Sequence, residues 1–188
     1  MIYRKYEVYT PVSRFHNFPN LIAMLEPMEI QWNIIYGPGV KFCHPELQWI
    51  KAFSAPQWPS DWHPAPWKAN WFLDHVPIDN HAMYLQLSDD DRYEPEFFQK
   101  VDDVDGDVLI VTMVNAPTPA GGRTTLIACK ENLRGSRIGG QQIIVKGDII
   151  RHHRYGSAYD GDWNFIESVT RNNSPVYIPD ATVFWNSL

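Results

Sequence analysis

Three consecutive aspartates follow residues 81–87, an apolar run typical of a buried strand. Adjacent carboxylates repel one another unless a cation is present, and Mg²⁺ binds through one or two carboxylates together with substrate phosphates. Because residues i and i+2 of an extended segment point the same way, Asp89 and Asp91 are expected to face one ligand while Asp90 points elsewhere. The alternative is a solvated acidic turn that caps a helix beginning near Glu94.

A second acidic group, Asp160 and Asp162, stands at the expected start of a helix over residues 160–169. The helix dipole favours an ionised carboxylate there, and capping alone would explain one of the two. A carboxylate fixed at a rigid helix start also suits the removal of a proton from an attacking hydroxyl. His152 and His153 precede this group, and each is either a structural histidine or a metal ligand.

The elements that must position these groups alternate between strand and helix. The sequence predicts a βαβ unit, made of a strand over residues 7–12, a helix over 21–25 and a strand over 30–36. Such units form parallel sheets. Further strands are expected at residues 81–87, 108–114, 142–146 and 176–178, and further helices at 67–74, 94–101 and 160–169. In such a sheet ligands bind outside the carboxyl ends of the strands, which is where the three aspartates stand.

The length of 188 residues predicts one α/β domain over 1–188, with a mixed, mainly parallel sheet flanked by helices. A net charge of −6 without a basic stripe argues against nucleic acid and acidic lipid as partners. No run approaches the roughly 18 apolar residues of a membrane span, and the N-terminus lacks the apolar core of a signal peptide, so the cytoplasm is the expected location. Cys43 and Cys129 are expected to be reduced and buried.

Tryptophans and prolines crowd residues 49–71. Because proline disrupts a helix interior, residues 53–66 are expected to form a long ordered loop. The rings of Trp58, Trp62 and Trp67 would either lie against a sugar or pack in the core beneath this loop.

Together these segments resemble family 2-type glycosyltransferases with the GT-A fold, over roughly residues 6–180. Residues 9–14, Tyr-Thr-Pro-Val-Ser-Arg, are similar to the first strand and loop that meet the nucleotide in that family, and residues 68–70, Lys-Ala-Asn, are similar to its basic-Ala-Asn element. Residues 87–91, Leu-Ser-Asp-Asp-Asp, look like its DxD metal motif. The resemblance implies a donor site formed by Thr10, Pro11, Val12, Arg14, Tyr36, Lys68, Asn70, Asp89 and Asp90.

The same resemblance implies a metal and an acceptor side. It implies Mn²⁺ or Mg²⁺ near Asp89 and Asp91, and His153 is the further candidate ligand. Residues 139–146 are similar to the acceptor-side segment, and the expected acceptor contacts are Trp58, Trp62, Gln141 and Trp163. Residues 161–163, Gly-Asp-Trp, fall where the family places its Glu-Asp pair, which implies Asp162 as the catalytic base, with Asp160 sharing or holding that role.

Three departures from the family pattern narrow the expected activity. Tyr36 and Gly37 stand where the family has an Asp that contacts the nucleoside, and Gly161 replaces the Glu of the Glu-Asp pair. No Gln-x-x-Arg-Trp motif follows, and its absence argues against a processive synthase. The expected reaction is metal-dependent transfer of a sugar from a UDP- or GDP-linked donor to a hydroxyl acceptor, with inversion. Two alternatives are a non-catalytic carbohydrate- or nucleotide-binding module and a glycoside hydrolase, which also uses two carboxylates.

Overall fold

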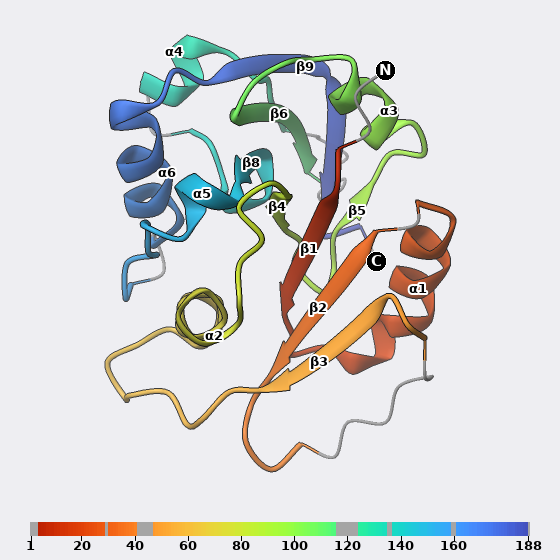
Figure 1. The fold of residues 1–188 in the computed structure, drawn as a ribbon, viewed down its shortest axis with the longest axis vertical. Coiled ribbons are helices and arrows are strands. Elements are labelled where there is room, and N and C mark those ends of the chain that lie inside the picture. Colours follow the sequence, from red (N-terminus) through yellow and green to blue (C-terminus); the bar gives the residue numbers. More distant parts are fainter. Residues whose placement is uncertain are drawn as a thin grey trace.

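The computed structural model describes residues 4–28, 30–40, 47–115, 124–134, 137–158 and 161–187. Its strands are β1 (Tyr6–Pro11), β2 (Gln31–Tyr36), β3 (Ile50–Ser54), β4 (Met83–Gln86), β5 (Arg92–Tyr93), β6 (Val108–Asn115), β7 (Thr125–Leu126), β8 (Ile143–Lys146) and β9 (Val176–Trp185). Its α-helices are α1 (Phe18–Leu25), α2 (Pro64–His75), α3 (Phe97–Asp102), α4 (Lys130–Arg134), α5 (Gly147–Ile150) and α6 (Gly161–Asn172) (Figure 1). Short 3-10 turns are η1 (Phe15–Asn17), η2 (Glu26–Met28) and η3 (Gly140–Gln142).

The strands form one sheet in the order β3-β2-β1-β4-β8-β6-β9-β5, and β7 pairs with β6. The first four strands are parallel, with Val8 of β1 opposite both Trp32 of β2 and Leu85 of β4. This pairing confirms the βαβ unit predicted at the start of the chain. Because β2 lies on one side of β1 and β4 on the other, the strand order reverses between β1 and β4, and such a switch point is the usual ligand site of an open α/β sheet.

The second half of the sheet mixes both directions. β8 is antiparallel to β4 and β6, whereas β9 is parallel to β6. β6 and β9 therefore run in the same direction as β1 to β4, and among the described strands β5, β7 and β8 run the other way, so the predicted mixed, mainly parallel α/β sheet is confirmed. The sequence does not separate the two directions here, because a strand buried on both faces, such as β6, reads as a continuous apolar run in either one.

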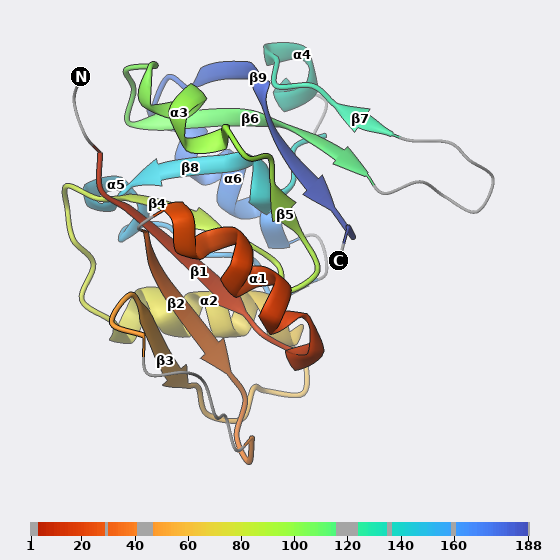
Figure 2. The same ribbon diagram turned by 90° about the vertical axis from the view of Figure 1, so that its right-hand side faces the viewer.

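Helices cover both faces of the sheet (Figures 1 and 2). α1 and α3 lie on one face, while α2, α5 and α6 lie on the other. Since successive strand side chains alternate between faces, Val8 belongs to the first core, and Tyr9 stacks on Phe72 of α2 in the second with ring centroids 5.3 Å apart. Packing on both faces therefore holds the carboxyl ends of β1 and β4 in place.

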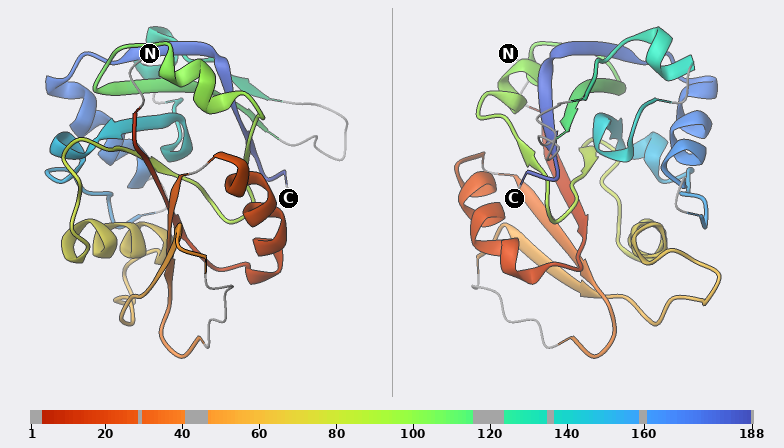
Figure 3. Two further views of the ribbon diagram at one scale, coloured as in Figure 1. Left: turned by 45° about the vertical axis from the view of Figure 1, so that its right-hand side comes forward. Right: turned by 180° about the vertical axis from the view of Figure 1, so that it is seen from behind.

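The bounds of two predicted segments near this edge of the sheet differ from those observed. The predicted loop over 53–66 is shorter, because β3 runs to Ser54 and α2 begins at Pro64, where a proline in the first helical turn costs no hydrogen bond. The strand predicted at 176–178 continues to Trp185, past an irregularity in its pairing with β6. The C-terminal end of β9 consequently lies beside β5 (Figure 3).

Two expectations from composition concern the cysteines and the membrane. Cys129 is a free thiol, as predicted, but it is half-buried, and Cys43 lies outside the described residues. Of the helices that the structure describes, none is both long and apolar enough to cross a lipid bilayer.

Candidate functional site

A cleft of about 390 Å³ opens at the carboxyl end of β4, next to the switch point. Its walls come from the loop after β1, the start of α2, the loop after β4, the turn before β8, the start of α6 and the end of β9. The residues that line it are Arg14, His63, Ala65, Pro66, Gln86, Ser88, Asp90, Met113, Gly139, Gln141, Asp162, Trp185 and Asn186. Asp90 and Asp162 are the carboxylates of this lining, so both acidic segments singled out in the sequence contribute to one cleft.

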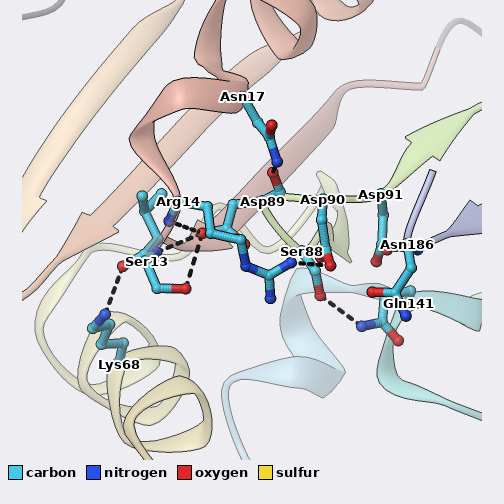
Figure 4. A network of polar contacts seen from close by, with 11 residues as sticks. Ser13, Arg14, Asn17, Lys68, Ser88, Asp89, Asp90, Asp91, Gln141 and Asn186 are labelled. Atoms are coloured by element: carbon cyan, nitrogen blue, oxygen red, sulfur yellow. Dashed lines mark hydrogen bonds and ion pairs between the residues drawn. The ribbon is translucent and has the colours of Figure 1, made fainter. Parts of the chain in front are cut away.

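Asp89 holds the loop after β1 (Figure 4). It does not line the cleft. Its Oδ2 accepts hydrogen bonds from the backbone N–H groups of Ser13 and Arg14, at 2.5 Å each, and from Ser13 Oγ at 3.1 Å. Asn17 Nδ2 donates to the carbonyl oxygen of Asp89 at 2.8 Å. Because these contacts occupy its carboxylate, Asp89 positions the chain at the end of β1.

The expectation that Asp89 and Asp91 face one ligand is wrong, because the acidic loop (residues 88–91) is a turn and not an extended segment. The Asp91 N–H donates to the Ser88 carbonyl oxygen at 3.2 Å, which closes the turn. The turn directs the Asp89 carboxylate toward the loop after β1 and the Asp91 carboxylate toward the end of β9. Asp90, which was expected to point elsewhere, is the aspartate of the three that lines the cleft.

The Asp90 carboxylate is paired with the guanidinium of Arg14. Arg14 Nη1 contacts Asp90 Oδ2, and Arg14 Nε lies 3.5 Å from Asp89 Oδ1. The Asp90 side chain is 8% exposed, whereas that of Arg14 is 47% exposed. A nearly buried carboxylate is therefore covered by a cation that reaches it from the solvent side of the cleft.

Asp91 anchors the C-terminal wall of the cleft. Its Oδ1 accepts a hydrogen bond from the Asn186 N–H at 2.9 Å, and the neighbouring Ser187 N–H donates to the Asp90 carbonyl oxygen at 2.8 Å. Asp91 is completely buried, and its Oδ2 has no hydrogen-bond partner among the residues that the structure describes. Burial raises the pKa of Asp91 to about 7, and the charge of Asp90 adds to this effect.

The raised pKa of Asp91 predicts a pH-dependent stability. Between about pH 4 and pH 7 the folded state keeps a proton that the unfolded state has released, so the free energy of unfolding falls as pH rises through this range. Asp91→Asn removes the titration and keeps the Oδ1 acceptor for Asn186. We expect the variant to gain stability relative to wild type by on the order of 3 kcal/mol at pH 8, and little at pH 4.

Urea unfolding at pH 4, 6 and 8, with EDTA present throughout, measures this difference. Asp162 also titrates, but it is common to both proteins, so the comparison isolates Asp91. A stability difference between the two proteins that is independent of pH would contradict the prediction.

Asp162 lies in the first turn of α6 and faces the turn before β8. Its Oδ2 accepts a hydrogen bond from the Gly140 N–H at 3.0 Å. Burial raises the pKa of Asp162, although the Gly140 amide and the charge of His63 oppose the shift. A Cβ on Gly140 would lie 2.8 Å from Asp162 Oδ2, so glycine is needed for this approach. A carboxylate with a raised pKa at a cleft suits general base catalysis, and Asp160 lies outside the described residues.

The packing around Gly161 explains why no Glu precedes Asp162 in this chain. A Cβ on Gly161 would lie 2.3 Å from the carbonyl oxygen of Gly156. The two glycines are also joined by a hydrogen bond from the Gly156 N–H to the Gly161 carbonyl oxygen at 3.1 Å. The close approach of these backbones leaves no room for a side chain, so a carboxylate cannot stand at position 161.

The predicted donor residues of β1 and α2 lie beside the cleft, largely buried. Thr10 is fully buried and its Oγ1 accepts a hydrogen bond from Trp32 Nε1 at 2.9 Å, while Pro11 and Val12 are buried at the end of β1. Lys68 Nζ donates to the Val12 carbonyl oxygen at 2.6 Å, and burial lowers the pKa of Lys68. These side chains support the loop that carries Arg14. Half-buried Tyr36 ends β2 and does not line the cleft.

Asn70 joins α2 to the segment before α6. Its Nδ2 donates to the Tyr155 carbonyl oxygen at 2.9 Å, and its Oδ1 accepts from the Tyr155 N–H at 2.8 Å. Asn70 is 6% exposed, so its amide is used by the backbone of Tyr155 and not turned toward the cleft.

Asn70→Ala is therefore expected to lower the free energy of unfolding by about 2–4 kcal/mol, because two buried backbone groups lose their partners. Urea unfolding measures the loss. Asn132→Ala is the matched control, since the Asn132 amide makes one exposed hydrogen bond, from Nδ2 to the Ile127 carbonyl oxygen at 2.7 Å. Equal stability of the two variants would show that Asn70 is not the structural link described above.

Four other predicted residues lie outside the cleft lining. Trp58 lies over Lys68, whose Nζ is 5.7 Å from the ring centroid, and Trp62 packs edge-on against a neighbouring indole of α2. Trp163 packs partly against the core under α6. His153 Nδ1 is hydrogen-bonded to Ser168 Oγ at 2.9 Å, and burial lowers the pKa of His153. Gln141 does line the cleft, as predicted for an acceptor contact, and donates to Ser88 Oγ at 2.7 Å.

Sequence reasoning did not single out several polar or aromatic residues of the cleft, among them His63, Trp185 and Asn186. His63 directly precedes α2, so the start of that helix would have indicated it. The signal for Trp185 was the apolar, aromatic and β-branched run over 181–185, which continues the strand predicted at 176–178. Pro179 and Asp180 interrupt the pattern and concealed the continuation.

The cleft offers a divalent metal the carboxylate of Asp90, whereas the predicted ligands Asp89, Asp91 and His153 lie outside its lining. Within the described parts of the chain, no group of three or more His, Cys, Asp or Glu residues could hold a metal by itself. Mg²⁺ commonly uses one or two carboxylates and completes its shell with water and substrate phosphates, a requirement that Asp90 meets from the cleft wall.

Comparison with models of known protein families finds no match, and no curated protein matches the sequence significantly. The function of the cleft is therefore inferred from its geometry and its chemistry.

Proposed function

We propose that the protein is a metal-dependent glycosyltransferase that uses a nucleotide-sugar donor and a hydroxyl acceptor. The observation that carries the proposal is the shared cleft at the switch point, where Asp90 and Asp162 come from distant acidic segments. Ligands of open α/β sheets bind at this place. The resemblance to GT-A glycosyltransferases supports the finer assignment, since its metal motif and its catalytic-base segment are the two segments that contribute these carboxylates.

The donor's diphosphate would lie against Asp90 and Arg14. Bound Mn²⁺ or Mg²⁺ would neutralise the charge that develops on the leaving diphosphate, acting as a Lewis acid. Asp90 would hold the metal. The guanidinium of Arg14 suits phosphate oxygens, because its planar donors can form two parallel hydrogen bonds.

Asp162 would take the proton from the acceptor hydroxyl as that oxygen attacks the anomeric carbon. The Gly140 N–H fixes the orientation of its carboxylate, and burial strengthens it as a base by raising its pKa. Direct displacement inverts the anomeric configuration. Trp185 and Gln141 line the same cleft and suit the apolar face and the hydroxyl groups of a sugar.

A thermal-shift and turnover screen of UDP- and GDP-linked sugars, with Mn²⁺ or with EDTA, tests the proposal. We expect the melting temperature to rise with one nucleotide class in the presence of Mn²⁺, and that donor to be consumed when a hydroxyl acceptor is supplied. No shift and no consumption with any donor and metal would refute the proposal.

A glycoside hydrolase is the second candidate, and the raised pKa of Asp162 favours it. Such enzymes pair a protonated carboxyl group, which acts as general acid, with an ionised carboxylate across the sugar, and Asp90 lines the same cleft. Turnover of a nitrophenyl glycoside that is unaffected by EDTA would support this candidate over the transferase.

A further inference from the structure

The acidic loop already holds a cation of its own. We propose that Arg14 is an internal counter-ion that occupies the cation position at Asp90, and that a divalent metal must displace its guanidinium to bind there. This inference rests on the proposed function, because it concerns the metal that the proposed function assigns to Asp90.

The backbone of Arg14 is held by hydrogen bonds, while its side chain is about half exposed. The Arg14 N–H and the adjacent Ser13 N–H both donate to Asp89 Oδ2, so the carboxylate of Asp89 fixes where the side chain of Arg14 starts. The side chain itself is 47% exposed and is held at its far end by ion pairs to the acidic loop (Figure 4). It can therefore leave Asp90 without disturbing the end of β1.

A metal and the guanidinium compete for the same oxygen. Arg14 Nη1 contacts Oδ2 of Asp90, the carboxylate that lines the cleft. A divalent ion bound at a carboxylate oxygen stands about 2.0–2.2 Å from it, and a guanidinium in hydrogen-bond contact with that oxygen would be repelled by the ion.

Displacement would convert Arg14 from a counter-ion of Asp90 into a residue that binds the diphosphate of the sugar donor. A guanidinium released from Asp90 has its N–H donors available at the rim of the cleft, beside the metal. A diphosphate bridging to that metal would be the nearest anion, and arginine binds phosphate oxygens through paired hydrogen bonds. Metal binding and diphosphate binding would consequently support each other through one side chain.

Mn²⁺ affinity, measured without any nucleotide, tests the competition. Electron paramagnetic resonance of free Mn²⁺ gives the Kd for wild type, Arg14→Gln, Arg14→Met and the control Arg92→Gln. We expect the two Arg14 variants to bind Mn²⁺ about fivefold more tightly, because two competing ion pairs are removed. Arg92 is exposed beside the acidic loop and lies over the ring of Phe184, so its removal subtracts the same charge without releasing Asp90. We expect Arg92→Gln to change the Kd less than twofold.

Calorimetry with inorganic pyrophosphate, at saturating Mn²⁺, tests the second step. We expect pyrophosphate to bind the Arg14 variants about tenfold more weakly than wild type. Melting temperature in EDTA shows whether each variant is folded, and using two neutral replacements guards against one that fails to fold.

Asp90→Asn separates the possible failures. If it abolishes Mn²⁺ binding while the Arg14 variants bind Mn²⁺ no more tightly than wild type, the counter-ion inference is overturned and the proposed function stands. If Asp90→Asn binds Mn²⁺ as well as wild type, or wild type and the Arg14 variants bind none, the metal assignment to Asp90 fails together with the inference.

Discussion

Asp162→Asn is expected to lower the rate of sugar transfer by about 10²–10⁴-fold, the usual contribution of a general base. The amide cannot take a proton from the acceptor hydroxyl. Its Oδ1 can still accept the hydrogen bond from the Gly140 N–H, so the local fold should persist. Initial rates at saturating donor and Mn²⁺ give the loss, and circular dichroism checks that the variant is folded.

The pH dependence distinguishes loss of a base from loss of structure. Burial raises the pKa of Asp162, so the wild-type rate should fall with decreasing pH at a higher pH than an exposed aspartate would give. The variant should lack this descending limb. Asp148→Asn, at the exposed start of α5, is the matched control and should retain both rate and pH profile. Full activity of Asp162→Asn would remove Asp162 from the mechanism.

Asp90→Asn is expected to abolish activation by Mn²⁺ and to lower the rate at saturating metal by about 10²-fold or more, since Lewis-acid stabilisation contributes several kcal/mol. An amide oxygen is a weaker ligand than a carboxylate for a hard cation. The measurement is the initial rate as a function of Mn²⁺ concentration, with the Kd for Mn²⁺ determined separately.

Asp89→Asn controls for the loss of one negative charge from the same loop. Asparagine retains an oxygen that can accept the hydrogen bonds from Ser13 and Arg14, and Asp89 does not line the cleft. We therefore expect Asp89→Asn to retain activation by Mn²⁺, whereas Asp90→Asn loses it. Equal loss of activation in both variants would contradict the assignment of the metal to Asp90 alone.

The elements that build the ligand edge were predictable from local patterns. The strand at Glu7, the helix before Pro27 and the strand at Trp32 each carry a distinct apolar period, and their succession implies parallel pairing. The position of the aspartates after an apolar strand was correct for the same reason. Less of the second half of the sheet was predictable from the sequence. β5 and β7 contain two residues each, and their pairing depends on the longer strands beside them.

The orientation of the three aspartates could not be read from the sequence. Whether Asp90 or its neighbours face the cleft depends on the turn closed by the hydrogen bond from the Asp91 N–H to the Ser88 carbonyl oxygen, and on the distant backbone groups that hold the carboxylates of Asp89 and Asp91. An extended segment would have paired Asp89 with Asp91, and the composition of the segment suits both conformations. The contact of Arg14 with Asp90 follows from the turn as well.

The sequence by itself determined which segments become strands and helices, and that two acidic groups stand at element ends where ligands bind. Tertiary structure alone decided which carboxylates line the cleft, because the orientation of each carboxylate depends on backbone partners far away in the chain. The Asn186 N–H reaches Asp91, and the Gly140 N–H reaches Asp162. Local periodicity reports which face of an element is apolar, but a hydrogen bond between distant segments exists only once the sheet has brought their ends together.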